Sequence, residues 1–503
     1  MRDLLLGIDI GTSSCKCAVF DTEGAVVASA TEEYEVYRPK AFWAEQEPED
    51  WAKAVFSCIR KILSDTDVEP SEIKAVGTDG QGWSAIPVDR DGNVLARTPI
   101  WMDMRSQEIC DRLNREIGEE KIFSCAGNPL TPSYTTAKVT WFRENLPGIY
   151  PKIDKILQSN SYLVYRLTGK FSQDISQGYA FHCFDMKKGA WDMEMAKALG
   201  IEERFLPEIF ACDAVVGTVT EEAAGLTGLL AGTPVVAGGL DAACGTLGAG
   251  VFSDGDTQEQ GGQAGGMSIC IEDYAADPKL ILSYHVVPDK WLLQGGTTGG
   301  GGAMRWFEQN FADYERTNGG KSSLVQLNEI AEKVPAGSEG LIFLPYMNGE
   351  RTPIWDPKAK GVFYGLDFSK TKGHFVRALM EGVAFALKHN LDVAEKAGAR
   401  VSTLRAMGGS ANSLLWTQIK ADVTGKEIIV PSSDTATTLG AAILAGVGVG
   451  LYSSYEEAVR KTVKDQRKHT PDPEKTEQYQ KVYETYLELY EDLKETMHKG
   501  GED

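Results

Sequence analysis

The sequence is poor in positive charge, which excludes two large classes of partner. Only 51 lysines and arginines stand against 72 aspartates and glutamates, giving a formal net charge of −21. Non-specific nucleic-acid binding and binding to anionic membranes both require a positive surface, so we expect neither. A nucleotide site is still allowed, because backbone N–H groups, helix N-termini and a metal ion hold phosphates without a basic surface.

Histidines, paired cysteines and long apolar stretches are also scarce. None of the six histidines pairs with another histidine or a cysteine at a spacing typical of zinc sites. The nine cysteines include no C-x-x-C pair, and their odd number predicts free thiols in a reducing compartment. The N-terminus does not resemble a signal peptide, and no stretch is long and apolar enough to span a membrane. We therefore expect a cytoplasmic protein.

What the chain does have is length, and the length predicts two domains. At 503 residues it exceeds the size at which one hydrophobic core keeps growing. Hydrophobic residues make up 42% and charged residues 24%, which is an ordinary globular composition. We place the domain boundary between residues 245 and 256.

Two β-hairpins with glycine-rich turns open the two halves of the chain. The first has expected strands at 4–10, 16–20 and 25–30 with a turn at 11–14, and the second has strands at 256–260 and 267–271 with a turn at 261–266. Further buried strands are predicted at 73–77 and 340–344 and within 233–241, and helices at 49–64, 374–396, 414–424, 439–445 and 473–499. The repeated hairpin predicts two halves of related architecture.

Asp9 lies in an apolar strand immediately before the turn Gly11-Thr12-Ser13. Such a turn lets backbone N–H groups and hydroxyls approach a phosphate closely. An acid on the preceding strand can hold a hydrated Mg²⁺. The alternative is a plain β-turn after a strand aspartate. Because a buried carboxylate without a partner is costly, we favour the phosphate and metal interpretation.

Asp241 follows a second apolar strand that stops at Gly238 and Gly239. At the start of a helix, aspartate is a common N-cap. In a cleft at the carboxyl end of a strand, the same carboxylate can accept a proton from a substrate hydroxyl. The residues of this segment alone leave both interpretations open.

Two more glycine clusters precede expected helices. Residues 299–302 are four consecutive glycines, a run that costs backbone entropy and indicates either a close backbone contact or a hinge. Gly408 and Gly409 precede Asn412, and paired glycines allow a flat base or a sugar to approach. Taken alone, a pair of glycines before a helix is usually only a turn, so this signal is weak.

Several longer segments, in their order along the chain, resemble the FGGY carbohydrate kinases, among which the xylulose kinases are the nearest well-known members. The resemblance covers nearly the whole chain. It is carried by residues 133–145, 345–353, 361–381 and 439–442. Several long motifs in the correct order are far more specific than any single glycine loop. Leu379 departs from the family, which more often has a smaller or β-branched residue there.

The resemblance implies an α/β fold in which two actin-like, ribonuclease H-like domains flank a catalytic cleft. Residues 1–247 are then the N-terminal domain, which binds the sugar and supplies the base, and residues 248–503 are the C-terminal, nucleotide-binding domain. Each hairpin turn is expected to hold the phosphates of ATP from one side. Closure of the two domains is expected to exclude water, which otherwise competes as phosphoryl acceptor.

The resemblance also implies roles for individual residues. Asp241 matches the family's catalytic base, and Asp9 the residue that helps to hold Mg²⁺. The residues expected at the nucleotide are Thr12, Ser13, Gly262, Gln263, Gly301, Arg305, Gly408, Gly409 and Asn412. Those expected at the sugar are Gln81, Gly82, Trp83, Asp103 and Asp241.

The chain departs from the family at both sites. The second phosphate turn usually reads Gly-Thr-Ser, whereas here it reads Gly262-Gln263-Ala264 and two hydroxyls are missing. Xylulose kinases carry Gly-Gln-Met-His-Gly at the sugar, whereas here Gly82 and Trp83 replace methionine and histidine. Kinases for erythritol and L-xylulose are similar in having Gly-Gln-Gly at this point.

Asp103 lies in a segment that keeps the family's tryptophan, aspartate and arginine. It is a candidate ligand for a sugar hydroxyl, and the alternative is a salt bridge to Arg105. The acidic helix expected at 473–499 is either a solvated face or a contact in a homodimer.

These observations favour a kinase that uses Mg²⁺ and ATP to phosphorylate a small sugar, with a ketopentose as the first expectation. Another ketose or a polyol is the alternative, including L-xylulose, ribulose or erythritol. The altered turn at Gln263 and Ala264 keeps open a sugar- and ATP-binding sensor that has lost catalysis. Actin-like chaperones and filament proteins also bind ATP, but they lack a base matching Asp241 and a segment like 345–353.

Overall fold

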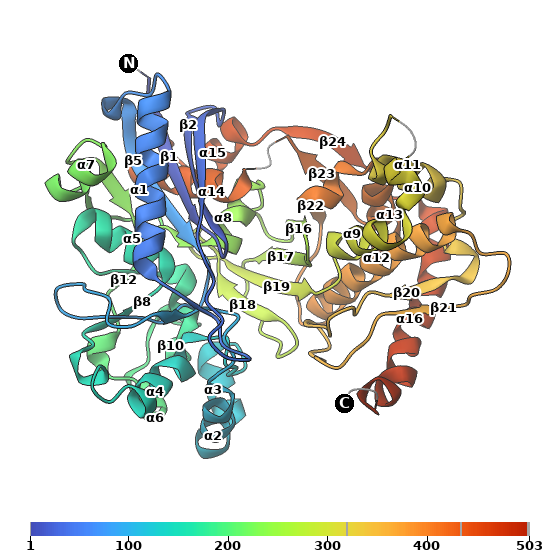
Figure 1. Cartoon of the computed structure of the whole chain (residues 1–503), viewed down its shortest axis with the longest axis horizontal. Coiled ribbons are helices and arrows are strands. Elements are labelled where there is room, and N and C mark those ends of the chain that lie inside the picture. Colours follow the sequence, from blue (N-terminus) through green and yellow to red (C-terminus); the bar gives the residue numbers. More distant parts are fainter. Residues whose placement is uncertain (1, 318–319, 433–434, 500–503) are drawn as a thin grey trace.

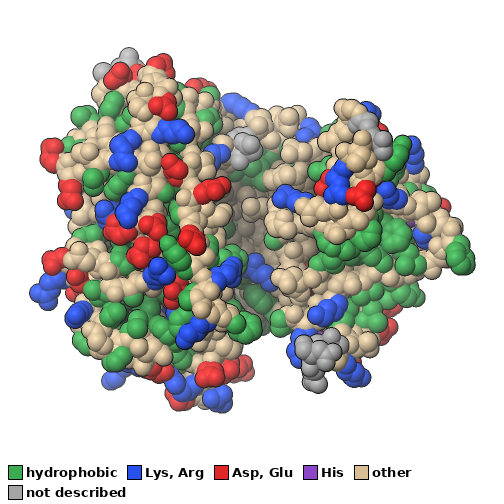
Figure 2. All heavy atoms as spheres, viewed as in Figure 1, with side chains coloured by type: hydrophobic (Ala, Val, Ile, Leu, Met, Phe, Trp, Pro, Cys, Tyr) green, Lys and Arg blue, Asp and Glu red, His purple; other side chains and the backbone are tan. Residues whose placement is uncertain are grey.

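The computed structural model describes residues 2–317, 320–432 and 435–499. The chain forms two lobes, each built on a mixed β-sheet, with a groove between them (Figures 1 and 2). The first sheet has the order β13 (Val215–Thr218), β14 (Pro234–Val236), β5 (Ile73–Gly80), β1 (Leu4–Ile10), β2 (Ser14–Asp21) and β3 (Val26–Glu33). The short strand β15 (Gly239–Leu240) also pairs with β5.

The second sheet repeats the central arrangement of the first. Its order is β18 (Ile281–Tyr284), β19 (Trp291–Thr297), β17 (Gly265–Ile271), β16 (Thr257–Gly261), β22 (Thr403–Met407), β23 (Glu427–Pro431) and β24 (Asp465–His469). In both sheets the first strand of an antiparallel hairpin pairs on its other side with a parallel strand, β5 in one case and β22 in the other. The predicted α/β fold with two related mixed sheets is confirmed.

The helices pack against the two sheets and against one another. They are α1 (Pro48–Asp65), α2 (Gln107–Ile117), α3 (Glu119–Ala126), α4 (Thr135–Asn145), α5 (Ser159–Thr168), α6 (Met193–Leu199), α7 (Glu221–Thr227), α8 (Asp241–Gly248), α9 (Gly301–Phe311), α10 (Asp313–Thr317), α11 (Ser323–Glu332), α12 (Lys372–Lys396), α13 (Leu414–Thr424), α14 (Ala436–Gly448), α15 (Tyr455–Thr462) and α16 (Pro473–Lys499). Short strand pairs outside the sheets are β4 (Glu45–Gln46) with β7 (Thr98–Pro99), β6 (Ile86–Val88) with β8 (Lys155–Leu157), β9 (Gln173–Asp174) with β12 (Ile209–Phe210), β10 (Phe184–Asp185) with β11 (Ala190–Trp191), and β20 (Ile342–Leu344) with β21 (Val362–Tyr364).

Amphipathic patterns in the sequence explain where the longer helices lie. The stripe predicted for the first helix, Trp51, Val55, Cys58 and Ile62, is buried in α1. Helix α16 buries a row of tyrosines in the second lobe, among them Tyr479, while its charged side faces solvent. Within the described ranges, no helix combines the length and the apolar character needed to cross a membrane.

Helix α14 joins the two halves of the chain. It belongs to the last quarter of the sequence, yet it packs against β1, β5 and α8. Glycines make the contact possible: a Cβ added to Gly440 would lie 1.9 Å from the carbonyl oxygen of Cys244, and one added to Gly7 would lie 2.0 Å from that of Thr438. The expected boundary between residues 247 and 248 falls at the end of α8, beside this contact.

The strand expected within 233–241 ends before the glycines, and a second short strand follows it. Strand β14 ends at Val236, and β15 then adds Gly239 and Leu240 to the same edge of β5. Gly238 has a φ of 73°, and a Cβ there would lie 1.8 Å from the carbonyl oxygen of Thr78. The glycine therefore allows the chain to step sideways and to start α8 at Asp241.

Candidate active site

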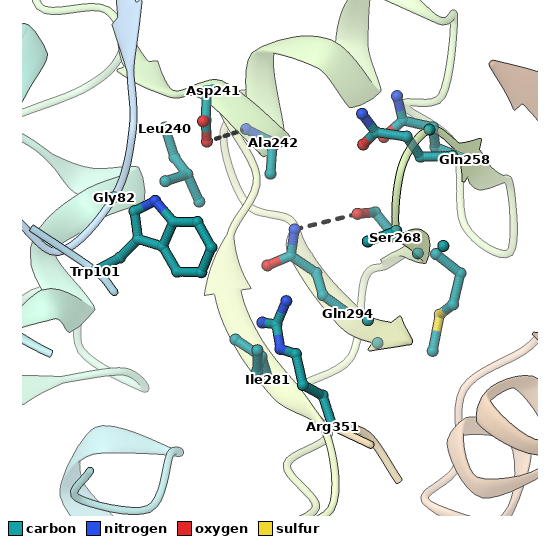
Figure 3. Close-up of a pocket in the computed structure, with 18 of the residues that line it drawn as sticks. Gly82, Trp101, Leu240, Asp241, Ala242, Gln258, Ser268, Ile281, Gln294 and Arg351 are labelled. Atoms are coloured by element: carbon teal, nitrogen blue, oxygen red, sulfur yellow. Dashed lines mark hydrogen bonds between the residues drawn. The ribbon is translucent and has the colours of Figure 1, made fainter. Parts of the chain in front are cut away.

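A cavity of about 410 Å³ lies between the two hairpin sheets, and both halves of the chain line it (Figure 3). From the first half come Gln81, Gly82, Trp83, Trp101, Tyr179, Leu240, Asp241 and Ala242. From the second half come Gln258, Gln260, Gly262, Gln263, Ala264, Gly265, Gly266, Met267, Ser268, Ile281, Gln294, Gly295, Gly296 and Arg351. A space of this size suits a small ligand held by a few polar groups.

Asp241 is the first residue of α8 and lines the cavity (Figure 3). Its Oδ1 accepts a hydrogen bond from the backbone N–H of Ala242 at 2.6 Å, and Leu240 occupies the N-cap position, so Asp241 is not the N-cap. Burial and the neighbouring charge of Asp9 raise the pKa of Asp241 to about 7. A carboxyl with such a pKa suits proton transfer near neutral pH.

Asp9 lies along the same edge of the first sheet, in register with Asp79 on the parallel strand β5. Burial raises the pKa of Asp9 to about 6, while a hydrogen bond with Asp79 and the charge of Lys16 act in the opposite direction. Burial and the charges of Asp9 and Asp241 raise the pKa of Asp79 well above its usual range. The carboxyl ends of β1, β5 and β15 thus gather three acids at one place.

The second hairpin turn packs closely against the start of α9. The N–H of Gly301 donates to the carbonyl of Gly262 at 2.8 Å, and the N–H of Gly302 donates to that of Gln263 at 2.9 Å. A Cβ on Gly300 would lie 2.3 Å from the carbonyl carbon of Ala264. Of the two interpretations offered for this glycine run, the close backbone contact is the one observed.

The loop after β22 completes this side of the groove. Gly408 has a φ of 83°, and a Cβ there would lie 2.9 Å from the carbonyl oxygen of Gly261, so the loop touches the base of the turn. Beside it, Lys420 donates to Glu259 at 2.6 Å and to Ser410 at 2.8 Å in a buried network. The remaining residues expected at the nucleotide, Arg305, Gly409 and Asn412, have exposed side chains or backbone outside the cavity lining.

The first hairpin turn lies behind the cavity wall. The indole N–H of Trp101, a lining residue, donates to Oγ1 of Thr12 at 3.0 Å. Ser13 is exposed, and neither Thr12 nor Asp9 is itself part of the cavity lining. In this arrangement the second turn borders the cavity directly, and the first turn approaches it through Trp101.

Aromatic side chains from the first half of the chain, Trp83 and Tyr179, form part of the cavity wall. Trp83 stacks on Tyr134 with ring centroids 4.3 Å apart, and its edge meets Tyr179 at 6.0 Å. The φ of Trp83 is 63°, a left-handed conformation that a bulky residue rarely adopts and that often marks functional sites. Next to it, the side-chain amide of Gln81 donates to Gln46 at 2.7 Å. Three of the residues expected at the sugar therefore do line one cavity together with Asp241.

Asp103 is placed differently. Its carboxylate is buried and accepts hydrogen bonds from the guanidinium of Arg105 at 2.9 and 2.7 Å and from the N–H of Ala44 at 2.7 Å. Asp103 does not line the cavity. The salt bridge named as the alternative is formed, and these contacts occupy both oxygens of the carboxylate.

Comparison with known proteins decides the family. The sequence matches the FGGY family of carbohydrate kinases, its N-terminal domain over residues 4–248 and its C-terminal domain over residues 272–449. The chain belongs to the FGGY family. It is 29% identical to the xylulose kinase of Bacillus subtilis (strain 168) over 493 residues, which are 98% of this chain and 97% of that protein.

Two further similarities show that membership of the FGGY family does not identify the sugar. The gluconokinase of Bacillus licheniformis is 30% identical, over 97% of this chain and 96% of its own length. The crystal structure of xylulose kinase from Rhodospirillum rubrum superposes with a TM-score of 0.91 at 30% identity, and the match covers 98% of this chain and 100% of that one. The chain is therefore a carbohydrate kinase, and its relatives at equal identity carry the names of different sugars.

Several residues of this FGGY kinase that face the cavity were not predicted from sequence. Arg351 lines the cavity, and among the described residues its guanidinium forms no salt bridge (Figure 3). Tyr179, Gln258 and Gln294 come from three separate elements. Arg351 lies in segment 345–353, whose resemblance to the family is the one sequence feature that could have identified it as a site residue. Nothing in the local pattern shows that its side chain turns toward the first half of the chain.

Proposed function

We propose that the chain transfers the γ-phosphoryl group of ATP to a hydroxyl of a small open-chain sugar, with a ketopentose such as xylulose as the first candidate. The observation that supports this most is the position of Asp241. It faces the turn Gly262-Gln263-Ala264 across one cavity, so a base and a phosphate-binding turn border the same space. Such an arrangement is what phosphoryl transfer needs, because its catalysis is mostly positioning and charge neutralisation.

In this proposal Asp241 acts as the general base. It orients the acceptor hydroxyl and takes its proton as the phosphoryl group moves. The single hydrogen bond from Ala242 leaves the other carboxylate oxygen available. A pKa of about 7 keeps the carboxyl mostly ionised at slightly alkaline pH and still basic enough to accept a proton.

The residues beside Asp241 fit a divalent cation. Asp9 offers carboxylate oxygens at the carboxyl end of β1, and both oxygens of the neighbouring Asp79 are buried without a hydrogen-bond donor other than Asp9 among the described residues. Oxygen ligands of this kind suit Mg²⁺, which when bound would neutralise charge on the transferring phosphoryl group. We assign Asp9 to hold it, as the sequence predicts.

The two turns are proposed to hold the phosphates of ATP from opposite sides. Backbone N–H groups of Thr12 and Ser13 belong to one side, and those of Gly262 and Gln263 to the other. Gly301, Arg305, Gly408, Gly409 and Asn412 are assigned to the rest of the nucleotide. In this proposal residues 1–247 bind the sugar and contribute one of the two phosphate turns, and residues 248–503 bind the rest of the nucleotide.

A second candidate substrate class is an acidic sugar such as gluconate. The cavity contains a guanidinium, that of Arg351, which forms no ion pair among the described residues and is free to pair with a carboxylate. One of the similar relatives is a gluconokinase. L-xylulose, ribulose and erythritol remain alternatives within the neutral class, and a sensor without catalysis remains the alternative outside it.

The test is a coupled ADP-release assay with ATP, Mg²⁺ and a panel of ketopentoses, ketohexoses, tetritols, pentitols and aldonates. We expect one neutral five-carbon ketose to stimulate ADP release most, and Asp241→Asn to lose on the order of 10²- to 10⁴-fold of that rate. Asp111→Asn, a change of the same kind on the exposed side of α2, is the matched control and keeps full activity.

The results of the sugar panel distinguish the candidate substrates and the candidate functions. An aldonate as best substrate moves the assignment to the acidic class. No stimulation by any sugar supports the sensor and contradicts catalysis. An Asp241→Asn variant with undiminished turnover removes Asp241 from the role of base.

The compartment and the assembly are also proposals. All nine cysteines lie within the described ranges and are free thiols, which supports a cytoplasmic location. A homodimer stays a prediction. The tyrosine face of α16 is covered by its own lobe, so a partner would have to use the charged face.

A further inference from the structure

Asp79 is a buried acid that the sequence pattern did not single out and to which the proposed mechanism assigns no role of its own. It is 0% exposed, and apart from the neighbouring carboxyl of Asp9 neither of its carboxylate oxygens has a hydrogen-bond partner among the described residues. A carboxylate withdrawn from water without a partner is strongly unfavourable, so such a group is retained when something else compensates it.

Other buried acids of the same lobe show what a purely structural aspartate looks like here. Asp174 accepts from the hydroxyl of Ser176 at 2.6 Å, the N–H of Gln177 at 2.9 Å and the amide of Asn160 at 3.0 Å. Asp103 pairs with Arg105 at 2.7 Å. Among the described residues, by contrast, Asp79 has no N–H or hydroxyl donor and no cation, and its one polar neighbour is a second acid, Asp9.

The sheet places Asp79 at the centre of the acidic edge. Strand β5 lies between β1 on one side and β15 on the other, and Asp79 is in register with Asp9 on the first and Gly239 on the second. Partners in register on parallel strands point their side chains to the same face. Asp241 follows Gly239 by two residues, and its charge and that of Asp9 both act on Asp79. Asp79 is therefore directed toward the acids between which the phosphoryl group is proposed to pass.

We propose that Asp79 is a second protein ligand of the divalent cation, so that Asp9 and Asp79 form a two-carboxylate site on neighbouring strands. This rests on the proposed use of Mg²⁺ and ATP. Mg²⁺ is typically bound by one or two carboxylates, with water and substrate phosphates in the other positions. The proposed site has two protein ligands, and in the described parts of the chain no group of three or more acidic, histidine or cysteine side chains is arranged to hold a metal ion.

The site makes a prediction that does not depend on catalysis. With two carboxylates already in place, the protein binds a divalent cation before nucleotide arrives, and binds it more tightly once phosphates add oxygens. Loss of either carboxylate removes one ligand. We expect each loss to weaken the affinity for the cation by about 10-fold or more.

The experiment uses Mn²⁺ as the probe and electron paramagnetic resonance to count the free ion. Wild type, Asp79→Asn and Asp9→Asn are titrated without nucleotide and again with ADP. Thr78→Val is the matched control, because its hydroxyl is buried, also lacks a partner, and lies next to Asp79 on β5. Circular dichroism and thermal unfolding confirm that every variant is folded.

The proposal expects Asp79→Asn to weaken Mn²⁺ binding by about 10-fold or more in both titrations, as Asp9→Asn does, with Thr78→Val unchanged. Wild-type affinity in Asp79→Asn overturns it. That result would mean that Asp79 is protonated and donates a hydrogen bond to Asp9. Asparagine can replace a neutral donor of this kind, but it cannot replace a negatively charged metal ligand. Wild type that binds no Mn²⁺ without nucleotide also overturns it.

The failure of this proposal is separable from failure of the sugar-kinase assignment. The Mn²⁺ titrations contain no sugar and measure no turnover. If no sugar stimulates ADP release but Mn²⁺ binding depends on Asp79, the sugar-kinase assignment fails and the metal site stands. If a sugar does stimulate ADP release but Asp79→Asn binds Mn²⁺ like wild type, the assignment stands and the metal site fails.

Discussion

Asp241 shows how one position in the chain determines both the geometry and the charge of the site. It follows the sideways step at Gly238, so its carboxylate emerges at the carboxyl end of the sheet and not within it. Burial and Asp9 then raise its pKa to about 7. Elevated pKa values of this kind are typical of catalytic acids and bases.

The raised pKa of Asp241 predicts a pH dependence. A base must be ionised, and a carboxyl with a pKa near 7 becomes protonated as the pH falls through that value. We expect kcat/KM for the sugar to be constant above about pH 8 and to fall about tenfold per pH unit well below pH 7. The measurement is a pH–rate profile between about pH 5.5 and about pH 9, with thermal unfolding followed at each pH.

Asp241→Asn provides the control for this profile. Its much lower residual rate no longer depends on pH above about pH 7, because the ionising base is gone and Asp9, with a pKa of about 6, is still ionised there. A flat wild-type profile, or the same decline in the variant, contradicts the assignment of the decline to Asp241.

Asp9 and Asp241 were predictable because each is an acid in or after an apolar strand and next to glycines. Asp79 fits the same description, between Thr78 and Gly80, and the same reasoning applies to it once the strand is seen to be central in the sheet. Arg351 was not predictable. Its orientation depends on the packing of residues 350–352 against Gly296 and Thr298, as in the hydrogen bond from the N–H of Gly296 to Oγ1 of Thr352 at 2.6 Å.

At the scale of elements, the second hairpin turn and α9 act as one unit. The turn lacks the hydroxyls usual in its family, and its backbone is held instead by the N–H groups of Gly301 and Gly302. A Cβ on Gly301 would lie 2.6 Å from the carbonyl oxygen of Gly262, which is closer than any side chain tolerates. Helix α9 therefore fixes the turn only while its first residues are glycines.

This contact predicts the effect of Gly301→Ala. The added methyl group displaces the turn, so we expect the KM for ATP to rise by about 10-fold, with a smaller change in the KM for the sugar. The comparison is Gly225→Ala in α7, where a Cβ meets nothing within 4 Å, and there both constants stay unchanged. Equal changes in the two KM values for Gly301→Ala would contradict a role specific to the nucleotide side.

Regular elements with a clear pattern were predicted closely. The helices expected at 414–424 and 473–499 have these limits in the structure, and that expected at 439–445 is longer, at 436–448. The segment between residues 97 and 230 was described only as helices and loops, because its short strands, such as β9 and β12, pair over long sequence distances. Pairing of that kind leaves no local periodicity.

At the scale of the whole molecule, helix α14 from the second half of the chain packs on α8 and on the sheet of the first lobe. Helices α8 and α14 pack glycine to backbone, with a Cβ on Gly248 only 1.8 Å from the carbonyl oxygen of Ala436. Asp241, at the start of α8, is thereby linked to a helix that lies in the chain between β23 and β24 of the second sheet. Such a contact couples the position of Asp241 to the arrangement of the two lobes, and motion of the lobes is the expected way to close the groove over its ligands.

Asp241 is proposed to direct the γ-phosphoryl group of ATP to a sugar hydroxyl inside this cavity. The most direct measurement follows the label of [γ-³²P]ATP into the sugar that stimulates ADP release best, with wild type and Asp241→Asn compared. We expect labelled sugar phosphate in amounts equal to the ADP formed, and a loss of both on the order of 10²- to 10⁴-fold in the variant. Label that appears as inorganic phosphate, or a variant that labels sugar at the wild-type rate, would contradict it.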